Sequence, residues 1–153
     1  MILALTGQNV VAIEHVGSTA VPGLGAKPII DIMAAVRSLL DAEGCIEPLA
    51  RIGYEYVPDY EDVMPERRYF RKGARLGART HHLHMVELES DFWRRQLLFR
   101  DFLRTHTEAA RQYYSLKKGL ALKFRTNREA YTESKTSFIE EIVERAQNVE
   151  RDG

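Results

Sequence analysis

The stretch IEHVGSTAVPGLGAKPIIDI, residues 13–32, decides the fold that we expect for this chain. It starts inside residues 10–16, where apolar side chains alternate with others, and this pattern predicts a strand that ends at Gly17. A segment rich in glycine and proline, residues 17–28, follows. Residues 29–36 are then apolar at nearly every position, which is typical of a strand buried on both faces. The stretch therefore predicts two strands joined by a glycine-rich connection.

Short β-rich segments continue up to about residue 88. Residues 39–51 predict a helix, although Gly44 and Pro48 lower its helical propensity. Three further segments have the composition of strands, at residues 54–57, 68–71 and 82–88.

Helical periodicity replaces the β-rich pattern beyond residue 88. Apolar residues then recur every three or four positions, which predicts three amphipathic helices. The first and third are expected to be capped by Ser90 and Asn127, and the second to run from about Ala109 to Phe124. We therefore expect one domain of the α/β (α+β) class over residues 1–153. Its small mixed β-sheet should span about 10–88, and its helical region about 90–147.

Composition narrows the classes of partner. The 22 Lys and Arg residues balance 22 Asp and Glu residues, which argues against a large nucleic-acid interface but leaves room for a pocket that binds a small phosphorylated ligand. The single cysteine, Cys45, excludes an internal disulfide and suits a reducing cytoplasm. No apolar run approaches the ~18 residues of a membrane span. We expect a cytoplasmic protein without a membrane partner, and the apolar helical stripes are compatible with a homodimer.

Residues 13–32 resemble the signature of the GrpB family, a group of small proteins assigned to the nucleotidyltransferase superfamily. Further stretches agree with the same family in the same order. They are RRYFRKG at 67–73, HHLHMVE at 81–87, WRRQLLFRDFLRTH at 93–106, and the later YYSLKKGLA and REAYTESKTSFIEEI. The resemblance implies a nucleotidyltransferase-like core of the polymerase-β type. Family members usually begin with a further strand and helix, whereas only a dozen residues precede Ile13 here.

Gly17 and Ser18 match the phosphate-binding opening that the superfamily places after its first strand. A glycine lets the backbone approach a ligand, and free N–H groups with a hydroxyl suit a phosphate. Thr19 would add a second hydroxyl and Lys27 a positive charge. A simple strand-ending turn is the alternative interpretation of this pair. The spacing around Lys27 does not fit a Walker A loop.

Asp31 is an acid inside an apolar strand, where a carboxylate is costly unless it is paired or bound to a metal ion. Active nucleotidyltransferases carry an acidic pair on this strand that holds Mg²⁺, and the resemblance implies a metal-binding and catalytic role for Asp31. The second position of the pair is Met33 here. An ion pair with an arginine such as Arg68, or a hydrogen bond to the glycine loop, is the alternative.

His82 and His84 alternate along a predicted strand, so their side chains should share one face while His81 points the other way. In the superfamily fold this strand lies beside the acidic one. Asp31 with His82 and His84 would then form a site for a divalent metal ion (Mg²⁺, Mn²⁺ or Zn²⁺), with His84 as a catalytic ligand or proton acceptor. Phosphate binding, or hydrogen bonding to Asp31 without a metal ion, is the alternative.

Basic residues supply candidates for phosphate recognition. Arg68 and Arg71 belong to a basic, aromatic strand, and guanidinium groups bind phosphate through two parallel hydrogen bonds. A charged edge strand is the competing interpretation. Lys117, Tyr131 and Lys135 fall on the later helices; a surface position is the default for each, and only the resemblance implies a place in a pocket.

Two functions follow from these observations. The first is a nucleotidyltransferase that places a nucleotide or other phosphorylated ligand on the Gly17–Ser18 turn and transfers a nucleotidyl group with metal assistance. The second is a non-catalytic binding module, linked by the resemblance to coenzyme A synthesis because some family members are fused to dephospho-coenzyme A kinase. Met33 favours the second, since an acid at this position would favour catalysis.

Overall fold

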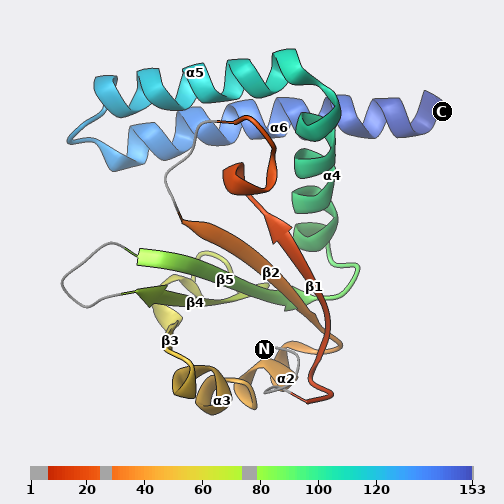
Figure 1. The fold of residues 1–153 in the computed structure, drawn as a ribbon, viewed down its shortest axis with the longest axis vertical. Helices are drawn as coiled ribbons and strands as arrows, with labels where there is room; N and C mark the ends of the chain where they lie inside the picture. Colours follow the sequence, from red (N-terminus) through yellow and green to blue (C-terminus); the bar gives the residue numbers. More distant parts are fainter. Residues whose placement is uncertain (1–6, 25–28, 74–78, 153) are drawn as a thin grey trace.

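A five-stranded sheet forms the centre of the computed structural model, which describes residues 7–24, 29–73 and 79–152 (Figure 1). The strands are β1 (Val10–Val16), β2 (Ile30–Val36), β3 (Tyr54–Val57), β4 (Arg67–Gly73) and β5 (Arg79–Glu87). They are ordered β1-β2-β5-β4-β3 across the sheet. The β2–β5 pair is parallel and the other neighbouring pairs are antiparallel, so the predicted mixed sheet is confirmed.

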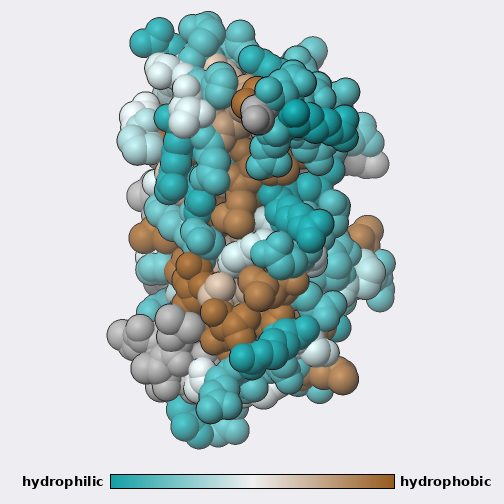
Figure 2. Space-filling model, turned by 90° about the vertical axis from the view of Figure 1, so that its right-hand side faces the viewer, coloured by the Kyte–Doolittle hydropathy of each residue, from teal (hydrophilic) through white to brown (hydrophobic). Residues whose placement is uncertain are grey.

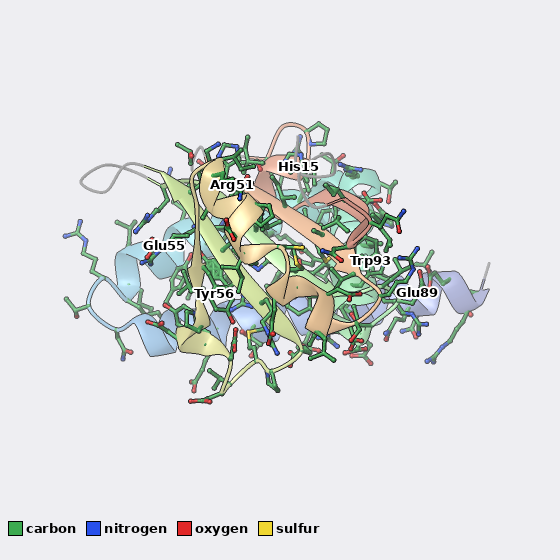
Figure 3. All side chains as sticks on the ribbon, turned by 90° about the horizontal axis from the view of Figure 1, so that it is seen from below. His15, Arg51, Glu55, Tyr56, Glu89 and Trp93 are labelled. Atoms are coloured by element: carbon green, nitrogen blue, oxygen red, sulfur yellow. The ribbon has the colours of Figure 1, made fainter. Side chains whose placement is uncertain are left out.

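Helices cover the sheet from both sides. Two short helices, α2 (Leu39–Glu43) and α3 (Ile46–Arg51), lie below it, and a 3-10 turn, η2 (Pro58–Tyr60), follows β3. Three long helices, α4 (Asp91–Thr105), α5 (Thr107–Lys123) and α6 (Arg128–Asp152), stand above and beside it, with α5 and α6 side by side (Figure 1). Seen from below, the short helices lie in front of the sheet and the long ones behind it (Figure 3).

The helix predicted over residues 39–51 is two helices instead of one, which corrects the prediction. Pro48 has no N–H group and cannot donate to the carbonyl of Gly44, so the helical hydrogen bonds do not continue across this point. Pro48 is tolerated because it falls in the first turn of α3, where N–H groups have no partner within the helix. The predicted caps of α4 and α6 are confirmed: Ser90 Oγ accepts from Trp93 N at 3.3 Å, and Asn127 Oδ1 accepts from Ala130 N at 3.0 Å.

The sheet buries apolar side chains on both faces. The lower face packs against α2 and α3 in a cluster that includes Ala34, Val36, Leu49, Phe70, Leu83 and Met85, with Tyr56 at its margin. The upper face contributes a smaller cluster of Val16, Met33, Ala35 and Val86 around Trp93 of α4. This double burial is the reason that β2 reads as a nearly continuous apolar run.

The three long helices share a third cluster with the turn after β1. It contains Val21, Phe99, Phe102, Leu103, Ala109, Tyr113, Ile142, Val143 and Ala146. The apolar stripes of these helices are therefore used within the chain, and the homodimer stays a prediction. The side on the right of Figure 1 still shows apolar surface between hydrophilic side chains (Figure 2). Within the described ranges, no helix is both long and apolar enough to cross a membrane.

Arg100 joins α4 to β1, which lies at the edge of the sheet. Its Nη1 donates to Glu14 Oε2 at 2.6 Å and to the His15 carbonyl at 3.2 Å, and its Nε donates to Asp101 at 2.8 Å. Arg100 is only 9% exposed, so its charge depends on these partners. The ion pair between Arg100 and its neighbour Asp101 in α4 is thus part of a contact between layers.

We expect Arg100→Met to lower the free energy of unfolding by about 2 kcal/mol, because the change leaves Glu14 and a carbonyl without their charged donor. Arg94→Met on the same helix is the matched control, since Arg94 pairs with Glu89 in an exposed position. The control should shift stability by no more than about 0.5 kcal/mol. Urea unfolding measures both variants, and equal losses would contradict the role given to Arg100.

Candidate functional site

A cleft of about 1380 Å³ lies between the upper face of the sheet and the long helices. Its floor comes from β2, β5 and the turn η1 (Ser18–Ala20), and its walls come from α4, α5 and α6. The lining of the cleft includes a group of polar residues and one glycine: Gly17, Ser18, Thr19, Asp31, His82, His84, Lys117 and Lys135. A cleft of this size can hold a nucleotide-sized ligand.

Strand pairing brings the predicted acid and histidines together. Parallel pairing sets Asp31 opposite His82, and alternation puts His84 on the same face. His82 Nδ1 lies 3.3 Å and His84 Nε2 lies 3.5 Å from the same oxygen, Asp31 Oδ1. The alternative pairing of Asp31 with Arg68 does not occur.

The electrostatics of this cluster keep Asp31 charged. Burial opposes ionisation, but the hydrogen bonds from His82 and His84 outweigh it and hold the pKa of the Asp31 carboxyl well below its ordinary value. Burial lowers the pKa of His84, and the attraction of Asp31 only partly offsets this. The cluster therefore contains a carboxylate beside a neutral, buried imidazole.

Gly17 approaches Asp31 so closely that no other residue fits there. A Cβ atom at Gly17 would lie 2.6 Å from Asp31 Oδ2, and the φ angle of Gly17 is +76°. Both observations require glycine, because a side chain would clash and the backbone conformation disfavours L residues. The hydroxyl of Thr19 is held within the same segment, 2.8 Å from His15 Nε2.

Two lysines reach this cluster from the helices. Lys117 Nζ donates to Ser18 Oγ at 2.8 Å and lies 5.2 Å from the centre of the Tyr113 ring. Burial lowers the pKa of Lys135, while the charge of Asp31 acts in the opposite direction. No described side chain forms a hydrogen bond or salt bridge with Lys135.

Lys117 and Lys135 line the cleft, as does Tyr131, so they do not have the surface position that is the default for such residues; a place in a pocket was implied only by the family resemblance. One signal could have found Lys117: it follows Tyr113 by four positions, so it lies next to the buried stripe of its helix. For Lys135 the local sequence gives no such signal beyond the resemblance, because its position near Asp31 depends on how α6 packs over the sheet.

The two predicted arginines are not brought to the cleft. Arg68 points to the lower face of β4, on the side of Phe70, and pairs there with Glu61 at 3.5 Å. Arg71 shares the upper face with His82, but its guanidinium pairs with Glu55 of β3 at 3.2 Å and is not part of the cleft lining. Lys27, predicted to bind phosphate, lies outside the described residues.

Comparisons with known proteins agree with this architecture. A family model described as "GrpB protein" matches residues 1–145. The crystal structure of the conserved protein GrpB from Enterococcus faecalis superposes with a TM-score of 0.81 at 36% identity, over 95% of this chain and 85% of that one. The UPF0157 protein PA4798 of Pseudomonas aeruginosa is 45% identical over 94% of this chain, which spans only 57% of that protein's length. A dephospho-CoA kinase of Mycolicibacterium paratuberculosis is 28% identical over 92% of this chain and 40% of the kinase.

Gly17→Ala should be more destabilising than Gly23→Ala by at least about 1 kcal/mol. Both glycines have a positive φ, at +76° and +77°, but a Cβ atom at Gly23 would meet nothing within 4 Å. The pair of variants therefore separates the backbone cost from the clash with Asp31. Urea unfolding measures the difference, and equal destabilisation would show that the close approach is absent.

Lowering the pH should destabilise the wild type relative to Asp31→Asn. The pKa of Asp31 is depressed in the folded state, so its stabilising contribution is complete above the unfolded pKa of about 4 and is lost as the pH falls below it. Asparagine does not titrate and lacks this dependence. Urea unfolding at several pH values between 7 and 3 measures it, and parallel curves for the two proteins would rule out the depressed pKa.

Proposed function

Because this chain belongs to the GrpB family, we propose that its cleft binds a small phosphorylated ligand, such as a nucleotide, with a phosphate group on the Gly17–Ser18 turn. The observation that carries the proposal is the contact between Lys117 and Ser18, 2.8 Å long, at a turn that only glycine can form. The Ser18 hydroxyl and the Lys117 ammonium group lie next to each other. They therefore offer a phosphate oxygen one neutral and one charged hydrogen-bond donor.

The charges around the turn support the same function. Lys135 is a half-buried cation that forms no salt bridge with a described side chain, although the charge of Asp31 favours its ionised form. Lys118 and Arg125 also line the cleft. A half-buried ammonium that is not directly paired is costly, so binding an anion would relieve part of this cost. Lys117, Lys118 and Lys135 come from α5 and α6, Arg125 comes from the segment between these helices, and Lys117 contacts the turn directly.

Asp31 is expected to bind a part of the ligand other than its phosphate group. It stays ionised, so it accepts hydrogen bonds and suits a hydroxyl group of the ligand rather than its phosphate. Its depressed pKa makes it a weak proton acceptor, since a general base works best with a pKa near the working pH. Asp31 is therefore better placed to orient a bound ligand than to remove its proton.

Nucleotidyl transfer is the second candidate function. In its favour, the Gly17–Ser18 turn converges with Asp31 and His84 in one open cleft, as the nucleotidyltransferase-like family suggests. Against it, Met33 occupies the position of the second carboxylate and is fully buried beside Trp93. An accessory role next to coenzyme A synthesis is a third candidate, supported by the match to part of a dephospho-CoA kinase.

Lys117→Gln and Lys135→Gln should each weaken the binding of ATP about tenfold, because each removes a charged donor. Lys72→Gln is the matched control: it removes the same charge from β4, where Lys72 lies 5.4 Å from the centre of the Tyr54 ring and neither residue lines the cleft. Isothermal titration calorimetry measures the dissociation constants. The proposal fails if the wild type does not bind ATP, or if the control weakens binding as much as the two cleft variants.

A further inference from the structure

The family resemblance implies a divalent metal ion on Asp31, which would help to hold the phosphate of a ligand. Whether such an ion fits depends on the atoms that surround this carboxylate. Mg²⁺ sites of this kind use two carboxylates together with the phosphates of the substrate. Met33 faces the same side of β2 as Asp31 but is 0% exposed. The second position is thus sealed inside the core and cannot supply a ligand.

The contacts of His84 fix which ring nitrogen carries its proton. Arg67 Nη1 lies 3.2 Å from His84 Nδ1, and a guanidinium group can only donate. Nδ1 therefore accepts, and the proton of the neutral ring is on Nε2. This nitrogen faces Asp31 Oδ1 at 3.5 Å, so Arg67, His84 and Asp31 form a relay of donors that ends on the carboxylate.

This arrangement is the opposite of a metal-binding histidine. Such a histidine presents one bare nitrogen to the metal ion and donates from the other to a carboxylate or carbonyl group. In His84, the nitrogen facing the cluster carries the proton and the other faces a cation. The donors at Asp31 therefore do not fit a divalent metal ion, and no group of three or more His, Cys, Asp or Glu side chains among the described residues is arranged to hold one.

Aromatic stacking holds the relay in place. The Tyr69 ring stacks on the His84 ring with centroids 5.5 Å apart and planes 12° from parallel, and the Arg67 guanidinium lies 5.0 Å from the Tyr69 centroid. Because Arg67 acts through His84 rather than on a ligand, it is a positioning residue. Tyr69 lies directly opposite His84 in the antiparallel pairing of β4 with β5.

We infer that this cleft binds the phosphate of its ligand without a divalent metal ion, with Lys117 and Lys135 supplying the positive charge and the Arg67–His84–Asp31 relay occupying Asp31 Oδ1 and both ring nitrogens of His84. This inference rests on the proposed function. It makes the cleft a lysine-based phosphate site with a separate carboxylate, which His84 holds in orientation and beside which His82 lies at 3.3 Å.

The first test measures the relay itself and needs no ligand. Two-dimensional ¹H–¹⁵N spectra of the histidine rings should show His84 with a bare Nδ1 and a protonated Nε2. Arg67→Met should weaken this preference and Arg67→Lys should restore much of it, because lysine also donates. Arg71→Met is the matched control on the same strand and face, since Arg71 pairs with Glu55 instead. A His84 ring with a bare Nε2 overturns the relay.

The second test compares ATP binding by calorimetry in EDTA with binding in Mg²⁺, Mn²⁺ or Zn²⁺, and titrates each metal ion alone. We expect dissociation constants for ATP that agree within about threefold across these conditions. Binding that appears only with a metal ion, or saturable binding of a metal ion that Asp31→Asn abolishes, overturns this inference but leaves the proposed function standing. Failure of ATP to bind under every condition overturns both.

Discussion

The parallel pairing of β2 with β5 is the constraint on which the rest of the site depends. It sets Asp31 beside His82, and alternation adds His84 on the same face. Two N–H donors then converge on one carboxylate oxygen, which offsets the cost of holding a charge in a partly buried position. A shift of β2 by one residue along β5 would turn the Asp31 side chain toward the opposite, apolar face of the sheet and separate it from His82 and His84.

The site is completed by elements that come from distant parts of the chain. Gly17 brings the turn against the carboxylate, and Lys117 fixes Ser18 from the side of α5. Arg100 and Arg104 anchor α4 to the same region, since Arg100 bonds Glu14 and the His15 carbonyl while Arg104 donates to the Ala20 carbonyl at 2.8 Å. The helical layer is therefore tied to the strand and turn that form the floor of the cleft.

Around the Gly17–Ser18 turn, the charges of the cleft come from two layers. Asp31 lies on the sheet beside His82 and His84, while Lys117 and Lys135 come from the helices. Asp91 and Glu140 of the helices also line the cleft, but both pair with Arg95. A ligand with a phosphate and a hydroxyl can contact both layers without bringing like charges together. Met33 reinforces this division, because its burial beside Trp93 leaves Asp31 as the one acid at that end of β2 among the described residues.

Sequence alone determined the strands, the turn at Gly17 and the shared face of His82 and His84, because each follows from local chemistry or from the two-residue period of a strand. That Asp31 lies on the same face as the two histidines depends on the pairing of β2 with β5. It also identified the family, whose model matches residues 1–145. It misjudged Arg68 and Arg71 because the sequence does not show that Glu61 and Glu55 bind them.

Only the tertiary structure decided which cations face the acid. Lys117 and Lys135 lie on α5 and α6. The helical period predicts which side chains share one face of a helix, but it does not predict which part of the protein that face contacts. This contact depends on how α5 and α6 pack over the sheet. The Arg67–His84 contact was equally hidden, since antiparallel pairing of β4 with β5 joins residues 17 positions apart. The periodicity of a helix or strand can be recognised in the sequence itself. The residues that its faces contact are determined by how whole helices and strands pack against one another.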